Sequence, residues 1–258
     1  MSNNFTSEHD RKIIDQFTKQ AEPFARVAGH SDAMNLLVDI AAVNNHDTVL
    51  DVACGPGLVA CFFAEYAEHV TGIDITETMI SAARKRQKEL ALTNMSWGVG
   101  TACQLPYAND TFSIVITRYS FHHFLNPDAV LKEMIRVCKP DGIVIAADVA
   151  IAPECAEFYD NMEKLRDPSH VKALTNIEFS TMFKISGLTG LQQKNYSVEM
   201  ELEAQLAASF PLPGGKDKLR AMLKADIGKN QLGVRAETRN RKIIYYYPIA
   251  IHAGKKSL

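Results

Sequence analysis

The sequence predicts a doubly wound, Rossmann-like α/β fold, in which a mostly parallel β-sheet carries helices on both faces. Two observations predict it. From about residue 47 onward, short apolar runs alternate with helical patterns, which is typical of strands joined by helical crossovers. The runs IVIT (114–117) and IVIAA (143–147) are apolar on both faces, as in buried parallel strands. We expect seven strands, with an antiparallel strand at one edge.

The expected elements follow one another in regular order. TVLDVA predicts a strand at 48–53, because aliphatic and β-branched residues favour strands, and an apolar stretch predicts a buried helix at 57–67. HVTGIDI predicts the second strand. The helix after it, 76–90, begins at Thr76 as N-cap and carries charges on its outer face. Further strands are expected at 95–100, 112–120 and 142–150, and a further helix at 127–139.

The remaining sequence is expected to surround this core. The segments are an N-terminal helical lid at 1–45, the core at 46–152, a helical substrate-lid insert at 153–235, and a C-terminal edge strand at 236–258. Part of the insert, about 176–200, is expected to belong to the core. We place the last strand at an edge because Pro248 cannot donate a ladder hydrogen bond and fits an edge better than a centre.

Composition argues against several classes of partner. The chain of 258 residues has a formal net charge of −2, so it lacks the basic excess that favours nucleic acid or an anionic membrane surface. No apolar stretch is long enough to cross a bilayer, and the polar N-terminal sequence has no apolar signal region. Five cysteines without a CxxC pair are expected to be reduced, buried thiols in a cytoplasmic protein, without a metal site. The sequence leaves a homodimer open.

The stretch VLDVACGPG (49–57) predicts a ligand-binding turn. Glycines at 55 and 57 with a small residue at 60 also fit the pattern that binds the pyrophosphate of a dinucleotide. A pyrophosphate needs free backbone N–H donors and no nearby anion. Here Asp51 stands at the turn, Pro56 removes one donor, and no Lys or Arg lies between residues 49 and 71. The charges therefore favour S-adenosylmethionine (SAM), which carries an ammonium and a sulfonium, over NAD. Asp74, which ends the next strand, is placed to accept hydrogen bonds from ribose hydroxyls.

Several motifs in this order resemble one known family. VLDVACGPG and VTGIDIT, followed by GTACQLPYANDTFSIVITRYSFHHF and EMIRVCKPDGIVIAAD, cover roughly residues 45 to 150. Together they resemble the class I SAM-dependent methyltransferases, in the small-molecule branch that includes the ubiquinone and menaquinone C-methyltransferases.

The resemblance implies a set of cofactor-binding residues. The amino acid end of SAM would be held by Asp51, Ala53, Gly55 and Gly57, and the ribose by Asp74. Ile75 and Met79 would pack on the adenine, Ala102 would meet an adenine nitrogen through its backbone N–H, and Arg118 would contribute backbone near the methionine portion. Gln20 would lie over the cofactor as part of the lid.

Two positions depart from the family pattern. The family's Gly-Asp-Ala after the third strand is Gly-Thr-Ala here, so Thr101 stands where a carboxylate would accept from the adenine amino group. A hydroxyl accepts more weakly than a carboxylate. The usual glycine two positions after the motif acid is Ala53.

Candidate residues for catalysis or substrate binding lie at the carboxyl end of the fourth strand and in the insert. Of the adjacent His122 and His123, one could face the cleft while the other packs beneath it. His123 is a candidate catalytic base, against a structural role for both histidines. His170 in RDPSH is a second catalytic candidate, against a loop or capping hydrogen bond. Tyr119 is a candidate for the substrate pocket, against simple packing.

The predicted function is transfer of a methyl group from SAM to a small aromatic or partly apolar molecule. Alignment and exclusion of water are the main requirements, since the sulfonium already activates the methyl group. The strand end TRYSFHH differs from the tetrapeptide of amino-methylating nucleic-acid enzymes, which argues against nucleic acid substrates. The alternatives are another reaction on the same fold, such as a cyclisation, or a non-catalytic SAM-binding partner.

Overall fold

The computed structural model of the protein describes residues 7–24 and 33–257. Its sheet has the strand order β3-β2-β1-β4-β5-β9-β7. β1 to β5 are parallel to one another, whereas β9 runs antiparallel to both of its neighbours, β5 and β7. The strands are β1 Thr48–Val52, β2 His69–Asp74, β3 Met95–Val99, β4 Phe112–Arg118, β5 Cys138–Ile151, β7 Thr189–Glu201 and β9 Lys242–Lys255, with short β6 Leu174–Thr175 beside β5 and β8 Glu237–Arg239 beside β9. The predicted fold class is confirmed.

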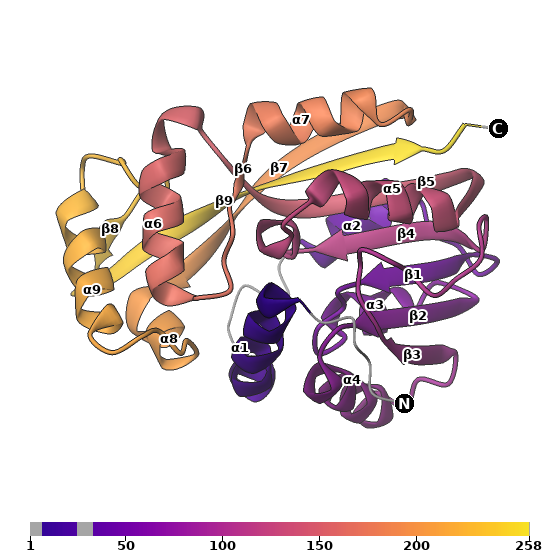
Figure 1. The fold of residues 1–258 in the computed structure, drawn as a ribbon, viewed down its shortest axis with the longest axis horizontal. Helices are drawn as coiled ribbons and strands as arrows, with labels where there is room; N and C mark the ends of the chain where they lie inside the picture. Colours follow the sequence, from indigo (N-terminus) through magenta and orange to yellow (C-terminus); the bar gives the residue numbers. More distant parts are fainter. Residues whose placement is uncertain (1–6, 25–32, 258) are drawn as a thin grey trace.

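Helices cover both faces of this sheet (Figure 1). They are α1 Glu8–Phe24, α2 Met34–Ala41, α3 Leu58–Phe63, α4 Glu77–Glu89, α5 Pro127–Val137, α6 Ala156–Arg166, α7 Asn176–Ile185, α8 Leu202–Ala207 and α9 Gly215–Asp226, with single 3-10 turns η1 Phe121–His123 and η2 Pro153–Cys155. One apolar core lies between the sheet and α2 and α3, and a second lies between the sheet and α5 and α7. Neighbouring residues of β1 show the alternation, because Val49 joins the first core and Leu50 joins the second.

β5, β7 and β9 are much longer than the other strands and extend past them. A third apolar core packs their extended ends against α6, α8 and α9, which form the group at the left of Figure 1. Tyr159 of α6, Leu206 of α8 and Leu223 of α9 are each buried in it. The helices of the expected insert are therefore mounted on continuous strands of the main sheet.

The C-terminal strand differs in place from the expected edge strand. β9 lies between β5 and β7, so β7 forms that edge of the sheet. The pairing of β9 with β5 ends where Ile249 faces Val149, and the next residue of β5 pairs with β6. Pro248 faces Ser197 of β7 and lies just beyond the pairing with β5. The proline is tolerated inside the sheet because β9 has a single neighbour at that point.

α1 lies at the carboxyl edge of the first strands, between α4 and the group of α6, α8 and α9 (Figure 1). Gln16 of α1 donates a hydrogen bond to the backbone oxygen of Phe210, after α8, over 3.4 Å. Residues 1–6 and 25–32 of the expected lid lie outside the described residues.

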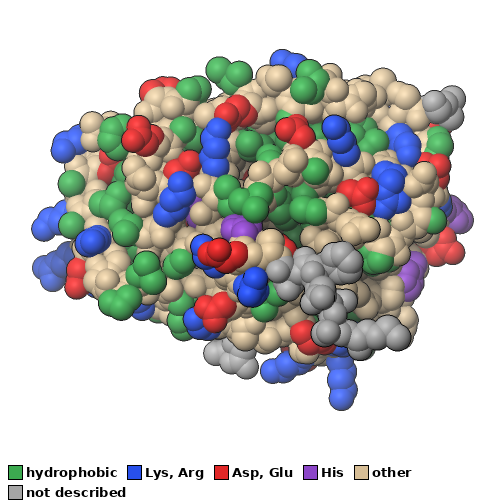
Figure 2. Space-filling view, viewed as in Figure 1, with side chains coloured by type: hydrophobic (Ala, Val, Ile, Leu, Met, Phe, Trp, Pro, Cys, Tyr) green, Lys and Arg blue, Asp and Glu red, His purple; other side chains and the backbone are tan. Residues whose placement is uncertain are grey.

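The charged side chains on the surface and the state of the cysteines agree largely with the expectations from the sequence. Figure 2 shows acidic and basic side chains interspersed over one face. Within residues 7–24 and 33–257, no helix is both long and apolar enough to cross a membrane. All five cysteines are free; four are buried as expected, but Cys103 is exposed.

Candidate active site

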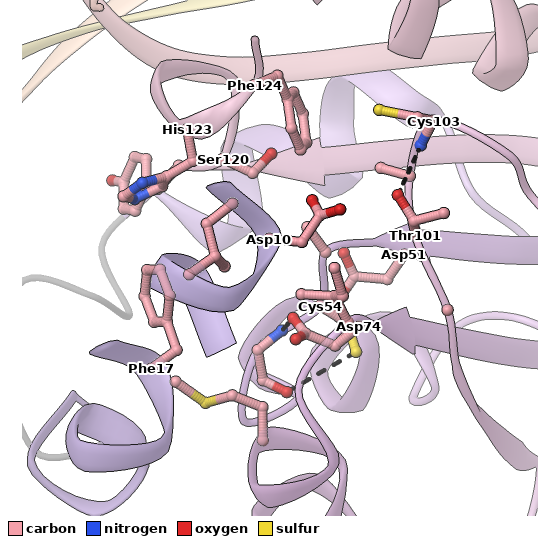
Figure 3. Close-up of a pocket in the computed structure, with 18 of the residues that line it drawn as sticks. Asp10, Phe17, Asp51, Cys54, Asp74, Thr101, Cys103, Ser120, His123 and Phe124 are labelled. Carbon is pink, nitrogen blue, oxygen red and sulfur yellow. Dashed lines mark hydrogen bonds between the residues drawn. The ribbon is translucent and has the colours of Figure 1, made fainter. Parts of the chain in front are cut away.

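A cavity of about 460 Å³ opens at the carboxyl ends of β1, β2 and β4, with α1 along one side (Figure 3). β1 lies between β2 and β4, and the order of the strands along the chain reverses at β1. This is the topological switch point at which open α/β sheets bind ligands. The volume lies within the range of about 300–1,000 Å³ that is typical of small-molecule sites.

The turn after β1 forms the floor of this cavity and has a strained backbone. Ala53, Gly55 and Gly57 all have positive φ angles, of 55°, 52° and 76°. Ala53 accepts this conformation although it has a Cβ atom, which costs about 1–2 kcal/mol for an L-residue. Gly55 lines the cavity with open space at its Cβ position. Gly57 does not line it. A Cβ at Gly57 would lie 2.8 Å from the Trp97 ring, so this glycine serves the packing of the turn.

Asp51, at the end of β1, is buried and lines the cavity. Its Oδ2 accepts a hydrogen bond from the backbone N–H of Ala60 over 3.0 Å, so it also binds the first turn of α3. Burial raises the pKa of Asp51 to about 8; the nearby Asp74 adds to the rise, while the N–H of Ala60 and the charge of Arg118 oppose it. A cation placed beside Asp51 would favour its ionised form.

Asp74, at the end of β2, joins two parts of the site. Its Oδ2 accepts from the N–H of Gly55 over 2.9 Å, and its Oδ1 accepts from the N–H of Thr76 over 2.8 Å. Burial raises the pKa of Asp74, although these N–H donors oppose the rise. Each carboxylate oxygen has two lone pairs, so both can accept a further hydrogen bond from a ligand.

Mostly apolar residues form another wall of the cavity. Ile75 and Met79 line the cavity at the start of α4, and Thr101 and Ala102 line it after β3. The Thr101 hydroxyl accepts a hydrogen bond from the N–H of Cys103 over 3.2 Å, which stabilises its own loop (Figure 3).

The end of β4 presents Arg118 and Tyr119 to the same cavity. Arg118 donates from Nη2 to the Tyr119 hydroxyl over 2.9 Å, and its guanidinium lies 4.2 Å from the centre of the Tyr119 ring. The Tyr119 hydroxyl also lies 2.8 Å from that of Tyr196 on β7. Burial raises the pKa of Tyr119 well above its usual value, and the neighbouring Tyr196 adds to this. Tyr119 is therefore a neutral phenol with a fixed side chain, in a backbone of φ 58°.

His123 is the histidine that reaches the cavity. Its Nδ1 lies 3.1 Å from the backbone oxygen of Ser169, a position that requires the proton on Nδ1 and leaves Nε2 as an acceptor. Ser169 in turn donates from its hydroxyl to Asp167 Oδ1 over 2.5 Å. Burial, and secondly the charge of His122, lower the pKa of His123. His122 pairs instead with Asp148 beneath it, over 2.7 Å.

The position of His170 corrects the expectation that it acts on the substrate. It lines neither this cavity nor the smaller one described next. Its side chain is 1% exposed and its Nε2 lies 2.8 Å from Asp160 Oδ1. His170 fastens the loop after α6 to that helix, which is the structural role weighed against catalysis.

Gln20 also differs from the expectation. It lies outside the cavity that contains Asp51 and Asp74, and lines a second cavity of about 70 Å³. There its Nε2 donates to Asp167 Oδ2 over 3.3 Å. The two cavities share Phe17, Tyr119 and His123 as lining residues, so they adjoin at the end of β4.

The sequence reasoning missed the residues by which α1 enters the first cavity. Asp10, Ile13 and Phe17 line it, and their spacing of three and four residues places them on one helix face, a signal that was available. His9, whose Nε2 lies 2.7 Å from the His123 backbone oxygen, ties α1 to the end of β4. Figure 3 shows Asp10 directed into the cavity from α1, so carboxylates reach it from both sides.

Residues 50–146 match the family description "Methyltransferase domain". The chain is 31% identical over 192 residues to the uncharacterized methyltransferase YcgJ of Bacillus subtilis, covering 72% of this chain and 76% of that protein. It is 33% identical over 143 residues to a demethylmenaquinone methyltransferase of Lactobacillus johnsonii, covering 47% of this chain and 57% of that protein. The crystal structure of Bacillus subtilis YcgJ matches with a TM-score of 0.81 at 24% identity, over 89% of this chain and all of that one.

The sheet order and the acidic cavity at the carboxyl ends of β1 and β2 define a Rossmann-like α/β protein with a ligand site at its switch point. The chain belongs to the class I SAM-dependent methyltransferases, the family whose cofactor is SAM. The family, the fold class and the cofactor predicted from the sequence are thus confirmed.

Proposed function

We propose that the protein transfers the methyl group of SAM to a small molecule bound beside His123. The observation that carries the proposal is the pair of buried carboxylates, Asp51 and Asp74, at neighbouring strand ends around one cavity. Asp10 adds a third carboxylate, and Arg118 is the single Lys or Arg among the described residues that line it. Such a site favours a ligand with positive charge and ribose hydroxyls over a dinucleotide pyrophosphate.

The cofactor is proposed to lie along the turn after β1. Asp51, with the backbone of Ala53 and Gly55, would hold the ammonium and carboxylate end, and Asp74 would accept from the ribose hydroxyls. Ile75 and Met79 would pack on the adenine. Ala102 and Thr101 would meet the polar edge of the adenine, and the Arg118 backbone would lie near the methionine portion. Asp10 and Phe17 of α1, which line this cavity, would cover the cofactor in place of Gln20.

The reaction requires the acceptor to approach the methyl group opposite the sulfur. The new bond forms as the carbon–sulfur bond breaks, and the bonding electrons stay on sulfur to give a neutral thioether. The protein chiefly aligns the two reactants and excludes water. If the acceptor atom carries a proton, His123 Nε2 is the proposed proton acceptor, because its other ring nitrogen is held by Ser169.

Calorimetric titration with SAM, S-adenosylhomocysteine and NAD tests the cofactor site, and transfer of a radiolabelled methyl group to small phenols tests the reaction. We expect the first two ligands to bind and NAD not to bind. Binding of NAD without SAM would overturn the proposal. We also propose the segment boundaries at 45, 152 and 235. Further proposals are a cytoplasmic location, a homodimer and the exclusion of nucleic acid substrates.

A further inference from the structure

The second cavity, of about 70 Å³, adjoins the first at the point where a methyl acceptor would react. Its walls come from β5, β7, β9, α6 and α8, and α1 covers it with Phe17 and Gln20. Apolar side chains form much of the wall, namely Val149, Val198, Met200, Ala208 and Ile249. The volume is several times what one water molecule needs, so the cavity can receive one end of a small molecule.

Every charged group that lines this cavity already has a partner. Glu163 accepts from Arg166 over 2.6 Å and from the Tyr247 hydroxyl over 2.9 Å. Asp167 accepts from Ser169 and from Gln20. Burial alone would raise the pKa values of Glu163 and Asp167, but the Arg166 guanidinium lowers both, and hydrogen bonds from Tyr247 and Ser169 add to this, so both are ionised. The basic side chains of the lining, Arg166 and His122, are paired with Glu163 and Asp148, so an anionic ligand would find neither of them free. A cationic ligand would find no unpaired carboxylate.

Among the uncharged polar residues that line this cavity, Gln205 of α8 has an oxygen without a hydrogen-bond partner. It is 7% exposed, and its Oε1 is the one buried side-chain polar atom without a hydrogen-bond partner among the described residues that line this cavity. A buried acceptor left unsatisfied costs about 1–3 kcal/mol. The oxygen itself is enclosed by protein, so rotation of the carboxamide about its last torsion is needed to turn it toward the cavity. There a ligand hydroxyl would satisfy it and can also accept from the carboxamide nitrogen.

We propose that Gln205 is a specificity-determining residue, which binds a hydroxyl group at the distal end of a neutral, largely apolar methyl acceptor. The acceptor extends from His123 into the second cavity, with its reacting atom toward the first. This inference rests on the proposed function, since it assigns the acceptor end of the same site. It predicts that the second cavity prefers a ligand with an uncharged hydroxyl group to one that lacks the hydroxyl or carries a charge.

The test uses the full chain saturated with S-adenosylhomocysteine and four probes: 4-methylphenol, 4-methylanisole, benzoate and benzylammonium. Binding is followed by ligand-observed NMR titration. A hydrogen bond to a buried neutral group changes affinity by about 5–10-fold. We expect 4-methylphenol to bind the native protein by about that factor more tightly than 4-methylanisole, which cannot donate, and more tightly than either ion.

The variant Gln205→Met keeps the length of the side chain and removes the carboxamide. We expect it to lose affinity for 4-methylphenol by the same factor and to bind 4-methylanisole unchanged. The matched control is Gln16→Met, another buried glutamine, which bonds Phe210 outside both cavities and is expected to keep the preference.

Two results would overturn the inference: equal binding of the two uncharged probes by the native protein, or tighter binding of an ion. A preference of the native protein does not by itself assign the hydroxyl to Gln205, because the same hydroxyl can bind His123 Nε2. If Gln205→Met fails to fold, Gln205→Asn, which keeps a carboxamide but retracts it, is expected to lose the preference in its place, and a retained preference in either folded variant would contradict the inference. Titration with S-adenosylhomocysteine separates the two proposals, because loss of that binding contradicts the proposed function, whereas normal binding without the hydroxyl preference contradicts this inference alone.

Discussion

Asp74 Oδ2 accepts a hydrogen bond from the backbone N–H of Gly55 over 2.9 Å, so the carboxyl end of β2 fixes the turn that follows β1. The same carboxylate is proposed to bind the ribose. A single side chain therefore shapes the floor of the cavity and offers a polar contact within it, and changes at this residue should affect ligand binding in both ways.

Asp74→Asn should weaken SAM binding by about 10–100-fold, because hydrogen bonds to a charged group contribute about 1.5–3 kcal/mol each. Calorimetry measures the change. Asp110→Asn is the matched control, since Asp110 is an exposed carboxylate that binds Lys256 over 2.6 Å and lies outside the cavity. Equal affinity of the Asp74 variant and the control would contradict the assignment.

Asp51→Asn should change how the ligand-free protein responds to pH. The pKa of Asp51 is about 8 in the folded state, against about 3.9 in an unfolded chain. Between these values the unfolded chain has released the proton and the folded protein retains it, so the residue's contribution to stability falls as pH rises. The asparagine variant lacks this loss. Urea unfolding at pH 5 and pH 8 should show the variant gaining stability relative to the native protein at the higher pH, and a constant difference would contradict a raised pKa.

Gly55 and Gly57 should respond differently to alanine, although both have positive φ. Gly57→Ala adds a contact of 2.8 Å with Trp97 to the backbone strain, and should lower the free energy of unfolding by about 2–4 kcal/mol. Gly55→Ala has open space and should lose about 1–2 kcal/mol from the backbone conformation alone, while its new methyl group enters the cavity and weakens SAM binding. Thermal unfolding and calorimetry together separate these effects. Equal stability losses would show that the Trp97 contact is relieved without cost.

The parts of the site that were predictable from the sequence are those encoded locally. Asp51 and Asp74 lie at the ends of strands that their apolar composition predicts, and the strained turn follows the first of them. Parallel strands bring their carboxyl ends to one edge of the sheet. Gln20 and Asp167, by contrast, are 147 residues apart and meet because α1 packs against the insert. No local pattern encodes that contact, or the existence of the second cavity.

The position of β9 inside the sheet could not be predicted for a similar reason. Pro248 predicted an edge, and the structure provides a local edge within an inner strand, because β5 turns to pair with β6 just there. The two adjacent histidines were ambiguous in the same way, since sequence gives alternating directions but does not say which side chain meets the cavity. His122 binds Asp148 beneath, and His123 faces the ligand site.

His123 should stay neutral well below the usual pKa of histidine, because it is buried beside His122. The unfolded chain takes up a proton near pH 6.5 and the folded protein does so only at lower pH, so the residue's full contribution to stability is present above about pH 6.5 and is lost as pH falls. NMR titration of the histidine rings should show no transition of His123 between pH 5 and pH 8. A transition of this ring near pH 6.5 would mean that it is solvated and that the site is open.

The role of His123 should be separable from that of His170 by paired glutamine variants. If His123 Nε2 accepts a proton from the substrate, His123→Gln should lower the methyl-transfer rate by about 10²–10⁴-fold with a phenolic acceptor and leave SAM affinity unchanged. His170→Gln removes the bond to Asp160 and should lower the unfolding temperature while the folded protein keeps its rate. Since burial keeps His123 neutral over this range by lowering its pKa, the native rate should not fall between pH 8 and pH 6 through protonation of this residue. A native rate in the His123 variant would contradict its role as proton acceptor. His123 would then only line the acceptor cavity, and the proton of the acceptor would pass to water.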